Sequence, residues 1–253
     1  MSAIKDEFEE NGYYVAKGLF NASEINYLVE DFDRIVDQLM ESDEDINARW
    51  KGDEQKIMGT QDTVIYHTHN VQRYSSRWRK AIMCEKFLDI VEEIIGEDII
   101  LHHSKLFQKP AGNGSPFPFH QDYSYFPTIA DSMMAGIIHV TDATDEMGCL
   151  RVMPGSHKLG PLENSNGQSN VEFLEKYPLE EGTILEAEAG DVVFFHYFTL
   201  HGSMPNVSSK VRKTVLTQMY SGKDAIVDSN SHFDEKLVLR GWNYNTTRSM
   251  AGV

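Results

Sequence analysis

Residues 117–127, FPFHQDYSYFP, constrain this chain more than any other segment, because they place an imidazole and a carboxylate two positions apart. On an extended strand, His120 and Asp122 would point to the same face. A second imidazole, His201, ends a strand-like run that begins at residue 189. Two histidines and one carboxylate leave other coordination positions of a metal open, which is the arrangement of non-heme Fe(II) oxygenases. The sequence therefore predicts a metal site at His120, Asp122 and His201.

The same residues allow other interpretations, because a His-x-Asp motif is also typical of a hydrogen-bonded histidine beside a structural aspartate. His196 competes with His201 as a ligand. We favour His201, because Gly202 and Ser203 let backbone and hydroxyl approach a small ligand closely, and we expect His196 to pack or hydrogen-bond near the metal. Arg212 begins a predicted strand and could bind the carboxylate of an organic acid that chelates the metal at its other end.

The hydrophobic pattern predicts one domain with two leading helices and a β-rich body. Asn21 and Glu24 form a capping sequence before a helix to about residue 40. A second helix is expected over residues 76–95, and an extended segment over 12–18. Residues 41–60 are expected to be a loop, and residues 163–181 a long connection that could act as a lid. Strands are predicted at residues 99–108, 117–123, 133–141, 149–153, 183–186, 191–196 and 212–220. Many short strands favour a closed sheet or two packed sheets.

Charge and composition exclude several classes of partner. The net charge of -16 disfavours nucleic acid and anionic membranes. No window reaches the roughly 18 apolar residues of a membrane span, and the start of the chain lacks the apolar core of a signal peptide. The two cysteines, Cys84 and Cys149, show no disulfide or zinc spacing, which predicts a cytoplasmic protein with reduced thiols. A small-molecule partner is therefore expected, and the sequence gives no indication of oligomeric state.

Four separated motifs occur in the order of one known family. They are HHSKL at residues 102–106, PFPFHQDY at 116–123, GCLRVMPGSHK at 148–158, and HGS at 201–203 followed by Arg212. With them the chain resembles the phytanoyl-CoA dioxygenase family of Fe(II)/2-oxoglutarate oxygenases. The resemblance implies a mostly β fold with flanking helices (α+β) around a double-stranded β-helix, or jelly roll. It implies a single oxygenase domain, with a helical flank at residues 1–98, the core at 99–222 and an extension at 223–253.

The resemblance also implies roles for particular residues. His120, Asp122 and His201 would hold Fe(II) at the catalytic centre, and Arg212 with Ser203 would bind the distal carboxylate of 2-oxoglutarate, with O2 as the other co-substrate. His103 and Lys105 would face the pocket and contact co-substrate or substrate, unless Lys105 is a solvated strand charge. Related halogenases lack the ligand carboxylate, so the chain is expected to be a hydroxylase.

The substrate is less constrained. Ile137 stands where family members often carry Trp, and His139 shares its face of the strand. The candidate substrate residues are His139, Tyr123, Arg151, His69 and Gln72. They favour hydroxylation of an aliphatic C–H bond in a small polar or phosphonate metabolite, such as an aminoethylphosphonate. An acyl-CoA or natural product remains an alternative, as do a non-catalytic 2-oxoglutarate- and metal-binding jelly roll and a structural zinc or cupin-like protein. The polar run at residues 66–73 could line the mouth of the barrel, or it could pair with a sheet edge and face water.

Overall fold

The computed structural model describes residues 2–42, 66–112, 114–163, 165, 171–227 and 232–245. Most of the predicted loop at residues 41–60, part of the predicted lid at 163–181 and part of the extension at 223–253 lie outside the described residues. In the described part of the chain, no helix is both long and apolar enough to cross a membrane.

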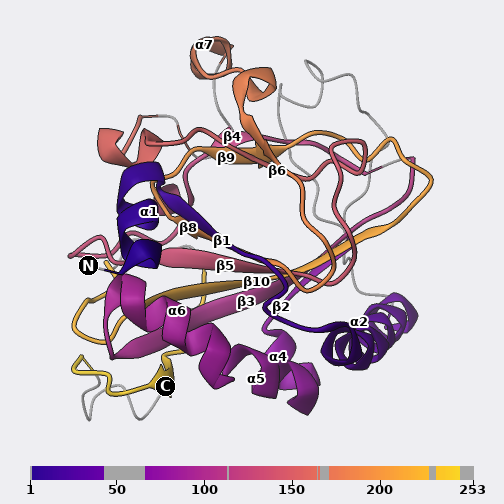
Figure 1. Ribbon diagram of the computed structural model, residues 1–253, viewed down its shortest axis with the longest axis horizontal. Coiled ribbons are helices and arrows are strands. Elements are labelled where there is room, and N and C mark those ends of the chain that lie inside the picture. The colour runs from indigo at the N-terminus through magenta and orange to yellow at the C-terminus, as the bar shows by residue number, and fades with distance from the viewer. Residues whose placement is uncertain are drawn as a thin grey trace.

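Two antiparallel sheets face each other and confirm the predicted jelly roll (Figure 1). The larger sheet has the order β1 (Tyr13–Ala16), β8 (Val192–His196), β5 (Met134–His139), β10 (Arg212–Ser221), β3 (Ile99–Lys109) and β11 (Leu237–Arg240), and β2 (Tyr66–His69) also pairs with β3. The smaller sheet has the order β4 (Phe117–His120), β9 (His201–Ser203), β6 (Leu150–Val152) and β7 (Thr183–Leu185). Sequence neighbours such as β8 and β9 lie in different sheets, so the chain passes repeatedly from one sheet to the other.

Helices cover the outer side of the larger sheet, as Figure 1 shows for α4, α5 and α6. The helices in the described residues are α1 (Ala3–Asn11), α2 (Ala22–Glu41), α4 (Val71–Tyr74), α5 (Ser76–Ile82), α6 (Glu85–Ile95) and α7 (Val171–Lys176), the last of which lies on the side of the smaller sheet. Short 3₁₀ helices occur at Asp122–Ser124, Ser156–Leu159 and Leu179–Glu181. The predicted capping box is confirmed, because Asn21 and Glu24 exchange side-chain and backbone hydrogen bonds. Neither α1 nor β11 was predicted, since α1 buries only Phe8 and β11 only Leu239.

The single helix predicted over residues 76–95 is wrong, because the chain breaks between α5 and α6. Cys84 has an extended backbone and precedes α6 as its N-cap. Ile82 and Phe87 are both fully buried but lie five positions apart. In a continuous helix they would point about 140° apart, since each residue turns the helix by about 100°. The break lets both segments face the same core.

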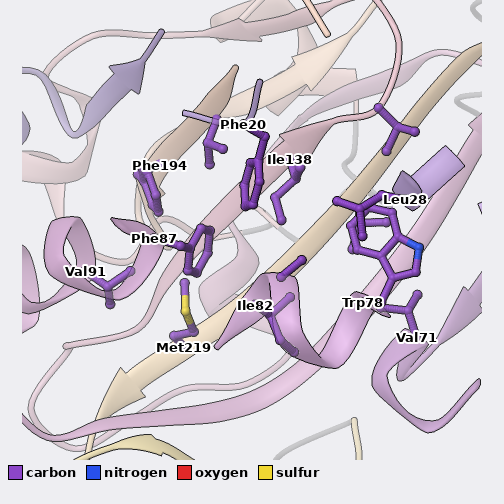
Figure 2. Packing of buried hydrophobic residues seen from close by; sticks show 14 of the residues in the cluster. Phe20, Leu28, Val71, Trp78, Ile82, Phe87, Val91, Ile138, Phe194 and Met219 are labelled. Carbon is purple, nitrogen blue, oxygen red and sulfur yellow. The ribbon is translucent and has the colours of Figure 1, made fainter. Parts of the chain in front are cut away.

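That core lies between the helices and the larger sheet. Figure 2 shows Phe87 of α6 next to Phe194 of β8 and Met219 of β10, and Trp78 of α5 next to Leu28 of α2 and Val71 of α4. A second apolar cluster, including Leu150, Val152, Phe195 and Leu216, fills part of the space between the two sheets. The core under the helices holds the outer face of the larger sheet, so a site can form between the inner faces of the two sheets.

Candidate active site

A cavity of about 470 Å³ opens between the inner faces of the two sheets. The strand pairing brings residues far apart in sequence to its wall. Along β10, alternate side chains face the cavity, namely Arg212, Thr214, Leu216 and Gln218. Lys105 and Phe107 face it from β3, and His120, His201 and Ser203 from the smaller sheet. A volume of this size is typical of small-molecule sites.

His120 and His201 stand directly opposite each other in the pairing of β4 with β9, with ring centroids 4.2 Å apart. Nδ1 of His120 lies 2.9 Å from the carbonyl oxygen of Pro118, and Nδ1 of His201 lies 2.9 Å from that of Thr199. Because a carbonyl oxygen only accepts, each Nδ1 carries the hydrogen and each Nε2 keeps its lone pair. Burial, followed by the nearby His201, lowers the pKa of His120 to about 4, so its imidazole is neutral at pH 7.

Asp122 lies close to both imidazoles, but its backbone conformation differs from the predicted strand. β4 ends at His120, and Asp122 begins a 3₁₀ helix, so the two residues do not share a strand face. Its Oδ1 nevertheless lies 3.8 Å from Nε2 of His120 and 3.6 Å from Nε2 of His201. Gln218 donates a hydrogen bond to the other oxygen, Oδ2, and so orients the carboxylate. The three ligand atoms lie within 4.8 Å of one another, so this donor set could hold a metal ion.

Buried Arg212 lines another part of the cavity, and a second buried cation, Lys109, lies beside it on the paired strand β3. The guanidinium of Arg212 donates to the carbonyl oxygen of Gly148, and its Nε has no partner within the described chain. Nζ of Lys109 donates to Oγ of Ser203 at 2.6 Å and to the carbonyl oxygen of Met204 at 2.8 Å. Burial lowers the pKa of Arg212 to about 10, and burial and the charge of Arg212 lower that of Lys109. Both cations bond to neutral oxygens, and neither has an anionic partner among the described residues, so a carboxylate could bind between them.

A third cation, Lys105, lies closer to Asp122, whose charge acts on it. Its Nζ lies 3.1 Å from Nε2 of His232, a neutral partner. Burial lowers the pKa of Lys105 to about 8, with Asp122 opposing that shift, so the amine remains mostly protonated at pH 7. His67 and Tyr125 also line this part of the cavity. The predicted alternative of a solvated strand charge does not apply, because Lys105 lines the cavity and is largely buried.

Two predicted substrate residues point away from the cavity. Arg151 is the middle residue of β6, whose other side chains, Leu150 and Val152, pack into the space between the sheets. Its guanidinium instead lies 2.8 Å from Oδ1 of Asp145. Tyr123 packs against Tyr197 and Phe198, with centroids 5.4 and 5.0 Å away. Neither residue lines the cavity.

Four other predicted contacts are also displaced from the cavity wall. Gln72 lies in α4, where its Oε1 accepts from Oγ of Ser104 at 2.6 Å. His69 and His103 contact the ring of His232, at centroid distances of 5.5 and 5.2 Å, and it is His232 that reaches the cavity. His196 was expected near the metal, but its Nε2 lies 3.0 Å from the carbonyl oxygen of Asp131 and it does not line the cavity.

Gln218, Lys109 and His232 were not predicted from the sequence, whereas His67 belongs to the polar run expected at the mouth of the barrel and does line the cavity. Strand alternation could have found two of them. Gln218 is six residues after Arg212 and Lys109 four residues after Lys105, so each shares a strand face with the residue that was predicted. His232 had no such signal, because it comes from a segment outside the strands. His139 does line the cavity, on the same face as Ile137, as predicted.

Comparisons with known proteins agree with this geometry. The family model described as phytanoyl-CoA dioxygenase (PhyH) matches residues 8–214. A "Probable alpha-ketoglutarate-dependent hypophosphite dioxygenase" of Stutzerimonas stutzeri is 28% identical over 227 residues, covering 87% of this chain and 78% of that protein. The peroxisomal phytanoyl-CoA dioxygenase of Bos taurus is 28% identical over 246 residues, covering 89% and 68%. Among solved structures, the non-heme alpha ketoglutarate dependent epimerase SnoN from nogalamycin biosynthesis shares the fold, with a TM-score of 0.74 at 18% identity over 94% of this chain and 97% of that one.

Proposed function

This chain belongs to the phytanoyl-CoA dioxygenase family of 2-oxoglutarate-dependent dioxygenases, and we propose that it hydroxylates an aliphatic C–H bond of a small, anionic metabolite. The observation that carries the proposal is the meeting of His120, Asp122 and His201 on one wall of a cavity that also holds Arg212. A structural zinc site would not explain the buried guanidinium of Arg212, whereas the carboxylate of a co-substrate would pair with it.

The three ligand residues fit Fe(II). Each imidazole has its Nδ1 bonded to a backbone carbonyl, which directs Nε2 to the carboxylate. Gln218 holds one oxygen of Asp122 and leaves the other for a metal. Bound iron, with 2-oxoglutarate and O2, would supply the oxidant for C–H cleavage. The protein's own contribution is a fixed donor set and a cavity whose wall includes the apolar side chains of Phe107, Phe195 and Leu216.

Arg212 and Ser203 would bind the distal carboxylate of 2-oxoglutarate. Support comes from their burial beside the cavity and from the Nε of Arg212, which has no hydrogen-bond partner among the described residues. Lys109, bonded to Ser203, would orient that hydroxyl and add positive charge. Together these donors can satisfy a carboxylate that would otherwise be costly to bury.

Lys105 supports an anionic group on the substrate. It is a buried amine whose hydrogen-bond partner, His232, carries no negative charge, so an incoming anion would lower the cost of burying it. The cavity must hold the co-substrate as well, and its volume of about 470 Å³ favours a small substrate over a complete acyl-CoA. A phosphonate such as 2-aminoethylphosphonate meets both conditions. A relative that is named as acting on hypophosphite agrees with a small phosphorus oxyanion.

The test is succinate release by protein loaded with Fe(II), under O2, with a panel of candidate substrates. The panel contains 2-aminoethylphosphonate, methylphosphonate, hypophosphite and phytanoyl-CoA. We expect small oxyanions to stimulate succinate formation, and Asp122→Ala to lose metal and at least about 100-fold of activity. Asp37→Ala, which removes an exposed carboxylate of α2, is the matched control and should keep wild-type activity. Normal turnover by Asp122→Ala, or no 2-oxoglutarate binding by the wild type, would contradict the proposal. Binding of 2-oxoglutarate without its O2-dependent consumption would favour the non-catalytic module.

A second pair of variants tests the substrate class. Lys105→Met should raise the KM of the oxyanion substrate by about 10- to 100-fold, as expected for loss of a hydrogen bond to a charged group. Lys80→Met, at an exposed position of α5, should leave it unchanged. An unchanged KM in Lys105→Met would remove the argument for an anionic substrate while leaving the dioxygenase assignment intact. We also propose a cytoplasmic location, which the free thiols of Cys84 and Cys149 support.

A further inference from the structure

His139 lies at the Arg212 end of the cavity. It is the last residue of β5 and pairs with Thr214 of β10, two positions from Arg212 on the same face. Gln218, which donates a hydrogen bond to Asp122, lies four residues beyond Thr214 on β10, or about 13 Å away at the usual rise of a strand. The imidazole therefore stands beside the residues proposed to bind the co-substrate and away from Lys105.

His139 is also unsatisfied. The side chain is 1% exposed, and neither Nδ1 nor Nε2 has a hydrogen-bond partner among the described residues. A buried polar group without a partner costs free energy, so such groups are uncommon unless a ligand completes them. Burial, with the charge of Arg212 adding to it, lowers the pKa of His139 to about 3. The imidazole is therefore neutral at pH 7 and offers one N–H donor.

A carboxylate at this position has room for that donor. Its two oxygens provide about four acceptor sites. Arg212 already uses one N–H on the carbonyl oxygen of Gly148, and Ser203 contributes a single hydroxyl. A neutral N–H from His139 adds a hydrogen bond without adding a further positive charge next to Arg212 and Lys109.

We infer that His139 is a third ligand of the distal carboxylate of 2-oxoglutarate, acting together with Arg212 and Ser203. The inference rests on the proposed co-substrate site. It moves His139 from the substrate side, where the sequence suggested it, to the co-substrate side. It also assigns a task to a histidine that otherwise has no partner in the described chain.

The experiment compares two ligands that differ at the distal carboxylate. 2-Oxoglutarate and 2-oxovalerate, in which a methyl replaces that carboxylate, are titrated calorimetrically into Zn(II)-loaded protein. His139→Leu should weaken 2-oxoglutarate binding by about 10- to 100-fold, as expected for a lost hydrogen bond to a charged group. It should change 2-oxovalerate binding by less than about 3-fold. His139→Asn retains an N–H donor and should recover part of the loss, and Ile137→Leu, on the same face of β5, is the packing control.

The outcomes separate this inference from the proposed function. Equal weakening of both ligands in His139→Leu, or no weakening of 2-oxoglutarate, would overturn the role of His139. If Arg212→Gln still weakens 2-oxoglutarate in that case, the co-substrate site itself stands. If the wild type does not bind 2-oxoglutarate, both ideas fail. Retained 2-oxovalerate binding shows that each variant is folded.

Discussion

Replacing His139 with Leu should make the protein less sensitive to acid. In the folded state the pKa of His139 is about 3, because burial and then Arg212 disfavour the imidazolium, whereas an unfolded histidine has its ordinary pKa of 6.5. Between these values the unfolded state binds a proton that the folded state does not. The free energy of unfolding of the wild type therefore falls as the pH drops below 6.5. Above pH 6.5 this titration contributes nothing.

The magnitude follows from the gap between the two pKa values. A pH of 5 lies about 1.5 units below the pKa of the unfolded histidine, and each unit corresponds to about 1.4 kcal/mol. The wild type should lose about 2 kcal/mol between pH 7.5 and pH 5 through this residue alone. At pH 7.5 the leucine variant should be within about 1 kcal/mol of the wild type, since it removes unpartnered nitrogens and keeps a similar volume.

The assay is urea denaturation at pH 7.5 and pH 5 in the presence of a chelator. The chelator is needed because metal release from His120 and His201 would otherwise add its own pH dependence. Other buried histidines are present in both proteins, so their titration cancels in the difference. Ile137→Leu should follow the wild type at both pH values. If the difference between His139→Leu and the wild type is the same at pH 7.5 and pH 5, the imidazole is not buried as a neutral group and the argument for its role weakens with it.

The remaining predictions concern the two walls of the site. Arg212→Gln should raise the Kd of 2-oxoglutarate by at least about 30-fold, because truncating one partner of a buried charge pair costs about 2–5 kcal/mol; metal affinity, measured by equilibrium dialysis, should not change. Gly202→Ala should lower the free energy of unfolding by about 1–3 kcal/mol in a thermal or urea melt. A Cβ there would lie 2.5 Å from the carbonyl oxygen of Phe117 and 2.8 Å from Cδ1 of Leu179. Because β4 and β9 would have to separate, metal binding should weaken too, and a variant of normal stability would refute the close approach.

The ligand residues could be predicted because their signal is local. His120 and Asp122 are two positions apart, and His201 precedes a glycine that lets two strands approach. His120, Asp122 and His201 do meet at one point, but the predicted strand conformation of Asp122 is wrong, since it lies in a 3₁₀ helix. An extended Gln121 still carries the chain far enough for the carboxylate to meet both imidazoles.

The errors come from contacts between distant segments. His103 was expected in the pocket from alternation with Lys105, but the ring of His232, from far along the chain, stacks on it and takes that place. Arg151 was assigned by charge alone, while the apolar neighbours on each side of it set the orientation of β6. The helix break at Cys84 depends on which faces of α5 and α6 meet the sheet. No local pattern contains that information.

The charges of the cavity constrain the substrate more firmly than its shape does. The chain as a whole is strongly acidic, with a net charge of -16, yet buried Lys109 and Arg212 and half-buried Lys105 lie close to or along one cavity. Burying a cation without an anionic partner is costly, so three such residues are difficult to explain as packing alone. A dicarboxylate co-substrate accounts for Arg212 and Lys109, and Asp122 would share its charge with a metal. Lys105 then has no anionic partner from the co-substrate, and a neutral substrate would not provide one. An anionic group on the substrate removes that cost, which is why the oxyanion panel, rather than a neutral metabolite library, is the first screen to perform.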